Sequence, residues 1–229
     1  MMKLCLKPIQ TRSREERVIV RCCYKEEGHI GSCEEFPYLS HLNVVAPRVA
    51  NKIKRDATKT TGAAWKSEDA GPNRIDRWAM LLNEEELLKK YKVNLSVLKP
   101  SVQAKLREKA ATYEDCMNVA AKLTFLVYQM KDAPTPPDLI HSYLENHFGL
   151  MSFGSTKCII CKDYLSFALF DEAKRGRAHI ETAHANPRIH NPENVGFAHR
   201  ECNIAQGNRT LDEFYEWMYK ILQRVEWKL

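Results

Sequence analysis

Apolar residues recur at helical spacing in three long stretches of this 229-residue chain. The strongest pattern covers residues 113–131, where apolar positions three or four residues apart predict a buried helix. Residues 138–148 predict a helix that follows the chain-breaking segment APTPPDL and ends at Gly149. Residues 211–229 predict an amphipathic helix. Its apolar face carries Phe214, Trp217, Met218 and Ile221.

Residues 83–109 predict a pair of helices. Asn83 caps the first helix, whose opening turn carries three glutamates, the residue type that the positive end of a helix dipole favours. The second helix starts near Leu95, and we expect Pro100 to limit it to about one turn. The pair is similar to a helix-turn-helix, but a plain helical hairpin is favoured because so short a second helix could hardly read a DNA groove.

These patterns predict an α+β protein that is predominantly helical. The proline-rich segment at 133–139 is the main expected boundary. We therefore expect an N-terminal segment (1–40), a basic helical DNA-binding region (41–132) and a C-terminal domain (138–229). No apolar run approaches the roughly 18 residues that a membrane span requires, and the N-terminus lacks the apolar stretch of a signal peptide. The sequence thus predicts a cytoplasmic protein without membrane contact.

Positive charge is concentrated in the first half of the chain. The net charge is +6, and residues 41–112 carry 15 Lys and Arg against 8 Asp and Glu, whereas residues 152–229 carry 11 against 10. A DNA backbone attracts such charge, because each neutralised phosphate releases counterions. A solvated helix face is the plainer alternative. The candidate phosphate contacts are Arg48, Lys52, Lys54, Arg55 and Lys59.

Cysteine and histidine pairs at metal-binding spacing are the clearest chemical signal. Cys158 and Cys161 form a C-x-x-C pair, and His199 and Cys202 form an H-x-x-C pair downstream. Thiolates and imidazoles are ligands that Zn²⁺ prefers, and four of them close a tetrahedral Cys₃His site of the structural kind. In a reducing compartment the eight cysteines favour metal over disulfides.

A second cluster lies near the N-terminus. Cys22, Cys23, His29 and Cys33 could form another zinc knuckle. The spacing fits no established zinc pattern, and the fourth ligand could be Cys5, either vicinal cysteine or His41. Cys22 and Cys23 follow the segment VIV, so they could equally be buried strand residues.

The run ENVGFAHRECNIAQGNRT, residues 193–210, resembles the second half of the HNH (ββα-metal) endonuclease motif. The segment AHI, residues 178–180, fits the first half. The resemblance covers residues 158–214. It implies a C-terminal ββα-metal unit that is stabilised by a Cys₃His zinc site.

The resemblance also implies roles for individual residues. His179 would be the general base that takes a proton from water, and Asn194 would hold the loop between the two strands and so orient His179. Asn203 would bind the catalytic cation, Mg²⁺ or Mn²⁺, which neutralises the scissile phosphate.

One position departs from the motif. Many members of the family carry an aspartate ligand directly before the catalytic histidine, where this chain has Ala178. His184 and His190 are also close enough to be rival bases, but the distance along the chain from His179 to Asn194 is nearer to the usual spacing. The nearby residues that could replace the aspartate are Glu181, His184, His190 and Asp171.

The expected function is metal-dependent cleavage of double-stranded DNA. The size and organisation of the chain suggest a type II restriction endonuclease that cuts a short specific site, and double-strand cleavage by single-site units implies a homodimer. The alternatives are a homing or phage HNH nuclease and a non-catalytic zinc-containing DNA-binding protein. An RNA-directed nuclease is a weaker option.

Overall fold

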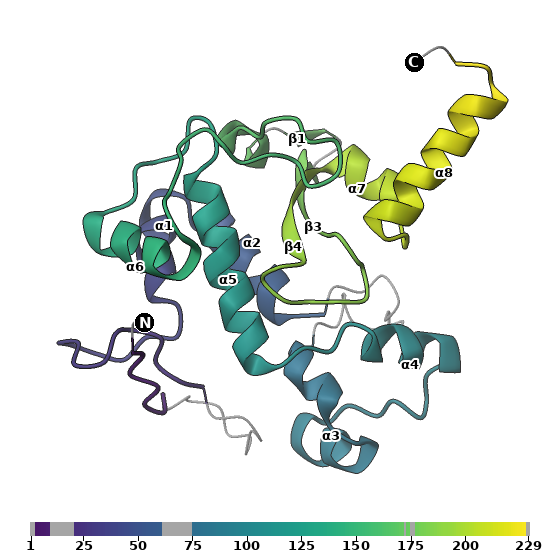
Figure 1. The fold of residues 1–229 in the computed structure, drawn as a ribbon. Coiled ribbons are helices and arrows are strands. Elements are labelled where there is room, and N and C mark those ends of the chain that lie inside the picture. Colours follow the sequence, from purple (N-terminus) through teal and green to yellow (C-terminus); the bar gives the residue numbers. More distant parts are fainter. Residues whose placement is uncertain (1–2, 10–20, 61–74, 172, 175–176, 228–229) are drawn as a thin grey trace.

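Helix α5 (Tyr113–Tyr128) lies at the centre of a computed structural model of the protein, which describes residues 3–9, 21–60, 75–171, 173–174 and 177–227 (Figure 1). The helix begins after Thr112, whose hydroxyl accepts a hydrogen bond from the backbone of Asp115 at 3.0 Å. Ten of its side chains are buried, so other parts of the chain cover it on nearly all sides. The predicted buried helix is confirmed, although it ends at Tyr128 rather than at residue 131.

Helices dominate the described residues, and the strands are short and close to the C-terminus. The predominantly helical α+β class is confirmed at this level. Besides α5, the elements are η1 (Pro37–Leu39), α1 (Ser40–Val45), α2 (Pro47–Thr58), η2 (Arg77–Leu81), α3 (Glu84–Tyr91), α4 (Pro100–Arg107), α6 (Asp138–Phe148), η3 (Phe167–Phe170), β1 (Ala173–Lys174), β2 (Arg177–Ala178), β3 (Ile180–His184), β4 (Val195–His199), α7 (Arg200–Gln206) and α8 (Leu211–Arg224).

Helices α2 and α6 and strand β4 pack around α5. Ile53 of α2, Leu123 of α5 and Phe197 of β4 are all fully buried in this core. Burying a side chain of this size stabilises the fold by about 1.5–3 kcal/mol. The core extends along the chain from Tyr38 to Phe214, across the proline-rich segment at 133–139. The expected N-terminal, helical and C-terminal regions therefore share one apolar core.

Helices α3 and α4 form a smaller unit beside η2, with its own apolar cluster. Asn83 caps α3 as predicted, and its side-chain oxygen accepts a hydrogen bond from the backbone of Glu86 at 2.8 Å. The expectation for Pro100 was wrong. Pro100 is the first residue of α4 rather than its end, because a proline at this position lacks only an N–H that would be unpaired anyway.

Strands β3 and β4 form an antiparallel pair in which Ile180 lies opposite His199 and His184 lies opposite Val195. Helix α7 starts directly after β4. It runs along β3, because the backbone of Arg200 bonds to His179 at one end and the side chain of Gln206 bonds to His184 at the other. The chain therefore forms two antiparallel strands followed by a helix. Strands β1 and β2 make a second, shorter antiparallel pair.

Helix α6 ends at Gly149, as predicted, with a φ of 86°. Helix α8 starts with a capping box between Thr210 and Glu213, and its one buried residue is Phe214. Trp217 and Met218 on the predicted apolar face are each 41 % exposed, because α8 extends away from the rest of the protein (Figure 1). In the described part of the chain, no helix combines the length and apolar character needed to cross a membrane.

Candidate active site and metal centres

Four metal-ligating side chains meet beside the β3–β4 pair. The ligand atoms of Cys158, Cys161, His199 and Cys202 lie within 4.8 Å of one another. Sγ of Cys161 lies 3.3 Å from Nδ1 of His199. Three sulfurs and one imidazole nitrogen from two tight turns fit a tetrahedral zinc ion.

Local structure explains how these ligands meet. Cys158 and Cys161 flank a turn in which the backbone of Lys162 donates to the carbonyl of Cys158 at 3.0 Å. The turn docks on β4 through a hydrogen bond from the backbone of Ile159 to Phe197, at 2.9 Å. Gly196 permits this close approach, because a Cβ there would lie only 2.3 Å from the side chain of Ile159.

A second group forms near the N-terminus from Cys5, Cys23, His29 and Cys33, whose ligand atoms also lie within 4.8 Å of one another. The sequence left the fourth member open. In the structure it is Cys5. Of the two vicinal cysteines, Cys23 points into the group and Cys22 does not.

His179 lies between β2 and β3, next to the first turn of α7. Its backbone N–H donates to the carbonyl of Leu169 at 3.2 Å, and its own carbonyl accepts from the backbone of Arg200 at 2.7 Å. The side chain is partly exposed, whereas its neighbour Ile180 is fully buried. Among the described residues, no group hydrogen-bonds to the imidazole.

Asn194 fixes the loop between β3 and β4. Its side-chain oxygen accepts from the backbone of Asn186 at 2.8 Å, and its amide donates to the carbonyls of Asn186 at 2.8 Å and Ile189 at 2.6 Å. These three bonds are side-chain to backbone contacts of the kind expected of the central asparagine.

Asn203 lies midway along α7 and lines a cavity of about 200 Å³ together with Thr182, His184 and His190. Arg77 and Lys109 line the same cavity, and Arg77 is only 4 % exposed. The cavity therefore combines the amide of Asn203 with two imidazoles, two cations and the carboxylate of Glu108. His179 does not line it.

His184 and His190 are joined to each other and to the backbone. Nε2 of His190 donates to the carbonyl of Ala57 at 2.8 Å, so Nδ1 of a neutral His190 can only accept. Nε2 of His184 supplies that proton across 2.9 Å. Burial, reinforced by the charge of Arg77, lowers the pKa of His184 to about 3, and the same two causes lower the pKa of His190. Both imidazoles are therefore neutral near pH 7.

We expect the protein to lose stability as the pH falls below about 6.5, the pKa of an unperturbed histidine. His184 and His190 stay neutral in the folded state but accept protons on unfolding, so the unfolded chain binds more protons in this range. The free energy of unfolding should fall by up to about 1.4 kcal/mol per pH unit for each imidazole. Denaturant unfolding at a series of pH values measures this slope.

His190→Gln should reduce the slope, and the same substitution at the exposed His147 is the control. Equal slopes for His190→Gln and the wild type would show that the buried imidazole does not cause the acid sensitivity.

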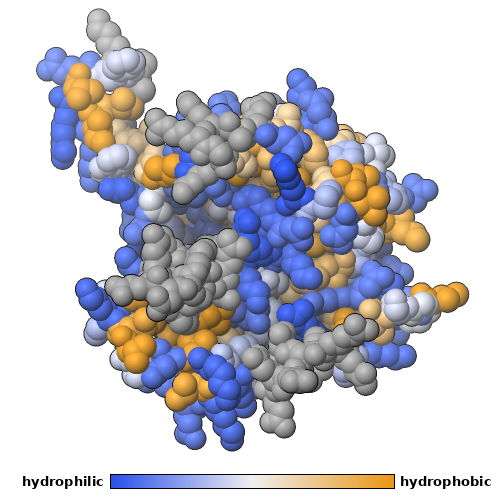
Figure 2. All heavy atoms as spheres, turned by 180° about the vertical axis from the view of Figure 1, so that it is seen from behind, coloured by the Kyte–Doolittle hydropathy of each residue, from blue (hydrophilic) through white to orange (hydrophobic). Residues whose placement is uncertain are grey.

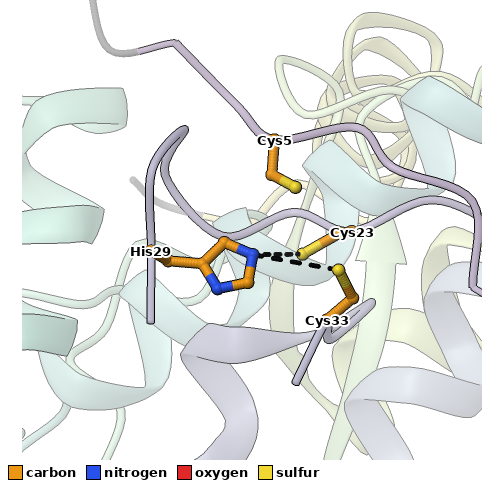
Figure 3. Close-up of side chains that lie close together, drawn as sticks. All are labelled: Cys5, Cys23, His29 and Cys33. Atoms are coloured by element: carbon orange, nitrogen blue, oxygen red, sulfur yellow. Dashed lines mark hydrogen bonds between the residues drawn. The ribbon is translucent and has the colours of Figure 1, made fainter. Parts of the chain in front are cut away.

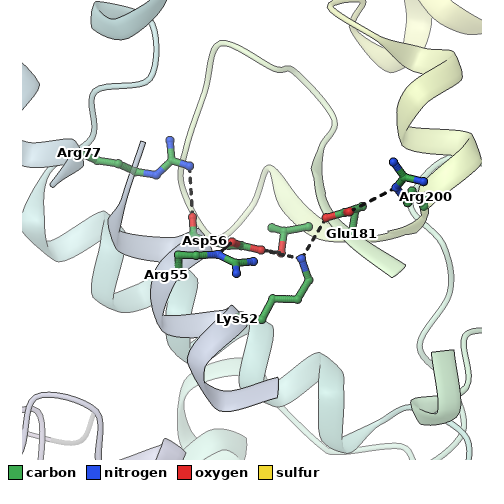
Figure 4. Close-up of polar contacts among 7 residues, drawn as sticks. Lys52, Arg55, Asp56, Arg77, Glu181 and Arg200 are labelled. Carbon is green, nitrogen blue, oxygen red and sulfur yellow. Dashed lines mark hydrogen bonds and ion pairs between the residues drawn. The ribbon is translucent and has the colours of Figure 1, made fainter. Parts of the chain in front are cut away.

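An ionic network joins α2 to β3 and α7 (Figure 4). Asp56, only 6 % exposed, accepts from Lys52 at 2.8 Å, from Arg55 at 2.7 Å and from the hydroxyl of Thr182 at 3.1 Å. Burial alone would raise the pKa of Asp56, but Lys52 and Arg55 outweigh it and lower that pKa below its usual value. The charged carboxylate of Asp56 thus links α2 to β3.

Glu181 belongs to the same network. Its carboxylate accepts from Lys52 at 3.1 Å and lies 3.8 Å from the guanidinium of Arg200. Glu181 and Ala178 line one cavity of about 280 Å³ with Arg48 and other residues of α2. Of the four replacements considered for the missing aspartate, Glu181 shares a cavity with Ala178, whereas His184 and His190 face the cavity of Asn203.

The predicted DNA contacts divide into two groups. Lys52 and Arg55 bond to Asp56, and Lys59 pairs with Asp76, so these cations are already neutralised within the protein. Arg48 and Lys54 are exposed on α2 and have no acidic partner among the described residues.

The sequence analysis missed two buried charges, Asp56 and Arg77. Both side chains face partners that are distant in sequence: Asp56 bonds to Thr182, and Arg77 donates to the carbonyls of Asp56 and Lys109, each at 3.2 Å. The one local signal was the i,i+4 spacing of Lys52 and Asp56.

Comparison with known proteins identifies the family. The DraIII family model matches residues 35–202, nearly three quarters of the chain. The chain belongs to the DraIII family of restriction endonucleases. A solved structure described as a type II restriction endonuclease is 44 % identical to it, covers 98 % of this chain and 99 % of the other, and superposes with a TM-score of 0.86. A search of curated proteins gives no match.

The DraIII match places most of the candidate site inside the family region. It includes His179, Asn194 and the four members of the C-terminal cluster, and it ends one residue before Asn203. Three of the four members of the N-terminal cluster precede residue 33, and all four lie outside the matched range.

Proposed function

We propose that this DraIII-family protein is a type II restriction endonuclease that hydrolyses double-stranded DNA with an HNH (ββα-metal) site. The observation that carries the proposal is the position of His179. Its imidazole, which has no hydrogen-bond partner among the described residues, stands at the start of two antiparallel strands and a helix, beside the Cys₃His cluster. The 44 % identity to a type II restriction endonuclease over the whole chain supports the same function.

In this proposal His179 is the general base. Its ring takes a proton from water, and the resulting hydroxide attacks the phosphorus, so that the bond to the leaving oxygen breaks. The backbone bonds from His179 to Leu169 and Arg200 keep the ring at the junction of strand and helix. Asn194 holds the following loop and thereby the strand on which the base stands.

Two oxygen donors are of the kind that a hard divalent cation prefers, and they line different cavities. Asn203 offers an amide oxygen on the wall of a polar cavity, and Glu181 offers a carboxylate beside Ala178. We assign Asn203 as a ligand of Mg²⁺ or Mn²⁺ and Glu181 as the nearest carboxylate to the position that an aspartate would fill. When bound, such a cation would neutralise the phosphate and stabilise the leaving 3′-oxygen.

We assign the C-terminal Cys₃His cluster as a structural zinc site. The cluster supplies four protein ligands, the full number of a tetrahedral zinc ion. No coordination position would be left for water, which is typical of structural rather than catalytic zinc sites. The ion would join the Cys158 turn to the junction of β4 and α7, on which His179 and Asn203 depend.

Plasmid cleavage tests the proposed function. Purified protein should convert plasmid DNA into a fixed set of fragments with Mg²⁺ or Mn²⁺ and leave it intact with a chelator in excess. One rare cut in a long substrate would instead indicate a homing nuclease. Binding without cleavage under all these conditions would indicate a non-catalytic zinc-containing DNA-binding protein.

We further propose a homodimer, because one such site cuts one strand. Exposed apolar side chains on and after α8 support this proposal. Trp217 and Met218 are each 41 % exposed and Trp227 is 67 % exposed, and Figure 2 shows apolar residues gathered on the segment that extends from the protein. Sedimentation of the purified protein measures the oligomeric state, and a monomer that still cuts both strands would contradict the dimer.

We expect the double variant Arg48→Glu, Lys54→Glu to bind DNA more weakly without a change in sequence preference. Both side chains are exposed and free of acidic partners among the described residues, and phosphate contacts carry no base information directly. The slope of log affinity against log salt should fall by about 0.9 for each lost phosphate contact. Binding titrations at several salt concentrations measure both effects.

The control is Lys89→Glu, Lys105→Glu, which makes the same charge change at exposed positions of α3 and α4. Lys52→Glu is not a clean probe, because it removes the partner of buried Asp56 and should destabilise the fold. Equal salt slopes for the Arg48, Lys54 variant and the control would mean that α2 does not contact the phosphates.

A further inference from the structure

The N-terminal group of cysteines and histidine is built like a second metal site. Nε2 of His29 lies 3.3 Å from Sγ of Cys23 and 3.9 Å from Sγ of Cys33. Figure 3 shows the ring of His29 turned toward these two sulfurs, with Cys5 reaching the group from a neighbouring segment. Three sulfurs and one imidazole nitrogen, all within 4.8 Å of one another, are a complete ligand set for a tetrahedral ion.

The surrounding backbone holds each ligand in place. Residues 3–9 run antiparallel to residues 21–27, and the backbone of Leu6 donates to Cys23 at 3.0 Å. Gly28 and Gly31, on either side of His29, have φ values of 85° and 91°, so the chain can turn His29 back toward the sulfurs. The backbone of Glu34 donates to Sγ of Cys23 at 3.3 Å, a contact typical of the groups around a metal-bound thiolate.

Ordinary burial does not explain this arrangement. A buried free cysteine usually packs as a small apolar side chain. Cys116 does so in the core next to Met117, whereas the sulfur of Cys23 faces an imidazole nitrogen and a backbone N–H. In residues 3–9 and 21–34, the described part of this segment, the buried apolar residues are Cys23 and Tyr24, so the described part has little apolar core of its own. A metal ion would supply the stability that the packing lacks.

We propose that Cys5, Cys23, His29 and Cys33 bind a zinc ion, which joins residues 3–9 to residues 21–33 and holds one wall of a cavity beside α2. The ion is independent of the C-terminal cluster, and the DraIII match does not include its ligands.

The cavity is the structural reason for such an ion. It measures about 360 Å³ and is lined by Arg21, Glu35 and Phe36 on one side and by residues of α2 on the other. Arg21 precedes Cys23 by two residues, and Glu35 follows Cys33 by two. The two side chains form an ion pair of 3.1 Å. Because Arg21 and Glu35 each lie two residues from a ligand, the ion would fix the position of the side of the cavity that they form. Lys54, Arg55 and Lys59 face it from α2 and the residue after it.

This position makes the cavity an extension of the α2 surface that we assign to DNA phosphates, so its use by DNA rests on the proposed function. The zinc ion itself does not. Arg21 itself is paired with Glu35, so the N-terminal ion would affect DNA binding through Lys54, whose ammonium lies 4.9 Å from the centre of the Phe36 ring on the opposite wall.

Metal analysis of the purified full-length chain tests the site. The wild type should hold two zinc ions, and Cys5→Ser and His29→Ala should each hold one. Cys22→Ser is the matched control, because Cys22 adjoins Cys23 but lies outside the group, and it should keep two. Cobalt substitution adds a spectroscopic signature, because tetrahedral thiolate ligation gives strong visible absorption, and Cys5→Ser should lose about half of it.

A wild type with one zinc ion, lost in Cys161→Ser but kept in both N-terminal variants, would overturn the site. DNA-binding measurements test the second part of the proposal, the role of the ion in the cavity. Cys5→Ser should weaken binding and flatten its salt dependence. If Cys5→Ser loses one zinc and still binds DNA like the wild type, the metal site stands but its role in the cavity is wrong. If even the wild type fails to bind DNA, the proposed function fails while the zinc count still decides the site.

Discussion

His179→Ala should abolish DNA cleavage while zinc content and DNA affinity stay close to those of the wild type. The loss of a positioned base typically lowers the rate by about 10²–10⁴-fold. The side chain is only partly buried and hydrogen-bonds to none of the described residues, so its removal leaves no polar partner unpaired and little core exposed. Single-turnover cleavage of a plasmid, with zinc analysis and DNA binding on the same preparations, separates catalysis from folding.

Three further substitutions make this result specific. Asn203→Ala should also slow cleavage, but through the cation, so raised Mn²⁺ should partly restore it and should not rescue His179→Ala. His184→Ala and His190→Ala test the rival bases. Full activity of His179→Ala together with an inactive His184→Ala would move the base to His184, which shares a cavity with Asn203.

The structure gives physical grounds for preferring His179 over His184. The pKa of His184 is lowered to about 3, mainly by burial, and such an imidazole accepts a proton poorly at neutral pH. Its Nε2 is already used to donate to His190. The side chain of His179 is partly exposed, and its ring nitrogens have no hydrogen-bond partner among the described residues. Asn203, the proposed cation ligand, lines the same cavity as His184. His184→Ala therefore has to be compared with His179→Ala.

Local signals in the sequence predicted the helices well. The bonds that define a helix end form between residues three or four positions apart, so Asn83 and Gly149 act wherever the helix is placed. Pro100 misled the prediction because a proline can either break a helix or begin one, and its neighbours alone did not decide between these.

Contacts between distant segments were beyond the sequence analysis. Nothing near Cys5 indicates that its segment pairs with residues 21–27 and so reaches Cys23 and His29. Lys52 looked like a DNA contact because its partner Glu181 is 129 positions away. Spacing thus defined the two zinc-type pairs near the C-terminus. Which charges are free to meet DNA depends on how α2 packs against β3.

Cys161→Ser should remove the C-terminal zinc and unfold the region that holds His179 and Asn203. The apparent binding free energy of a structural zinc site is about 10–16 kcal/mol in small zinc-binding peptides, far more than a single side-chain contact contributes. Cys161 is the best ligand to change because it is exposed, whereas Cys158 is fully buried and its substitution would also disturb the core. The effect of Cys161→Ser can therefore be assigned to the metal.

Hydrogen exchange combined with zinc analysis measures the outcome. Amides of the Cys158 turn, β4 and α7 should exchange much faster in Cys161→Ser, while those of α5 and α2 should stay better protected because neither helix carries a ligand of the ion. Cleavage should be lost together with the zinc. Cys22→Ser, outside both clusters, should change none of these. An unchanged zinc content in Cys161→Ser would refute the assignment, and lost zinc with unchanged protection would mean that packing of β4 on α5 suffices to hold the site.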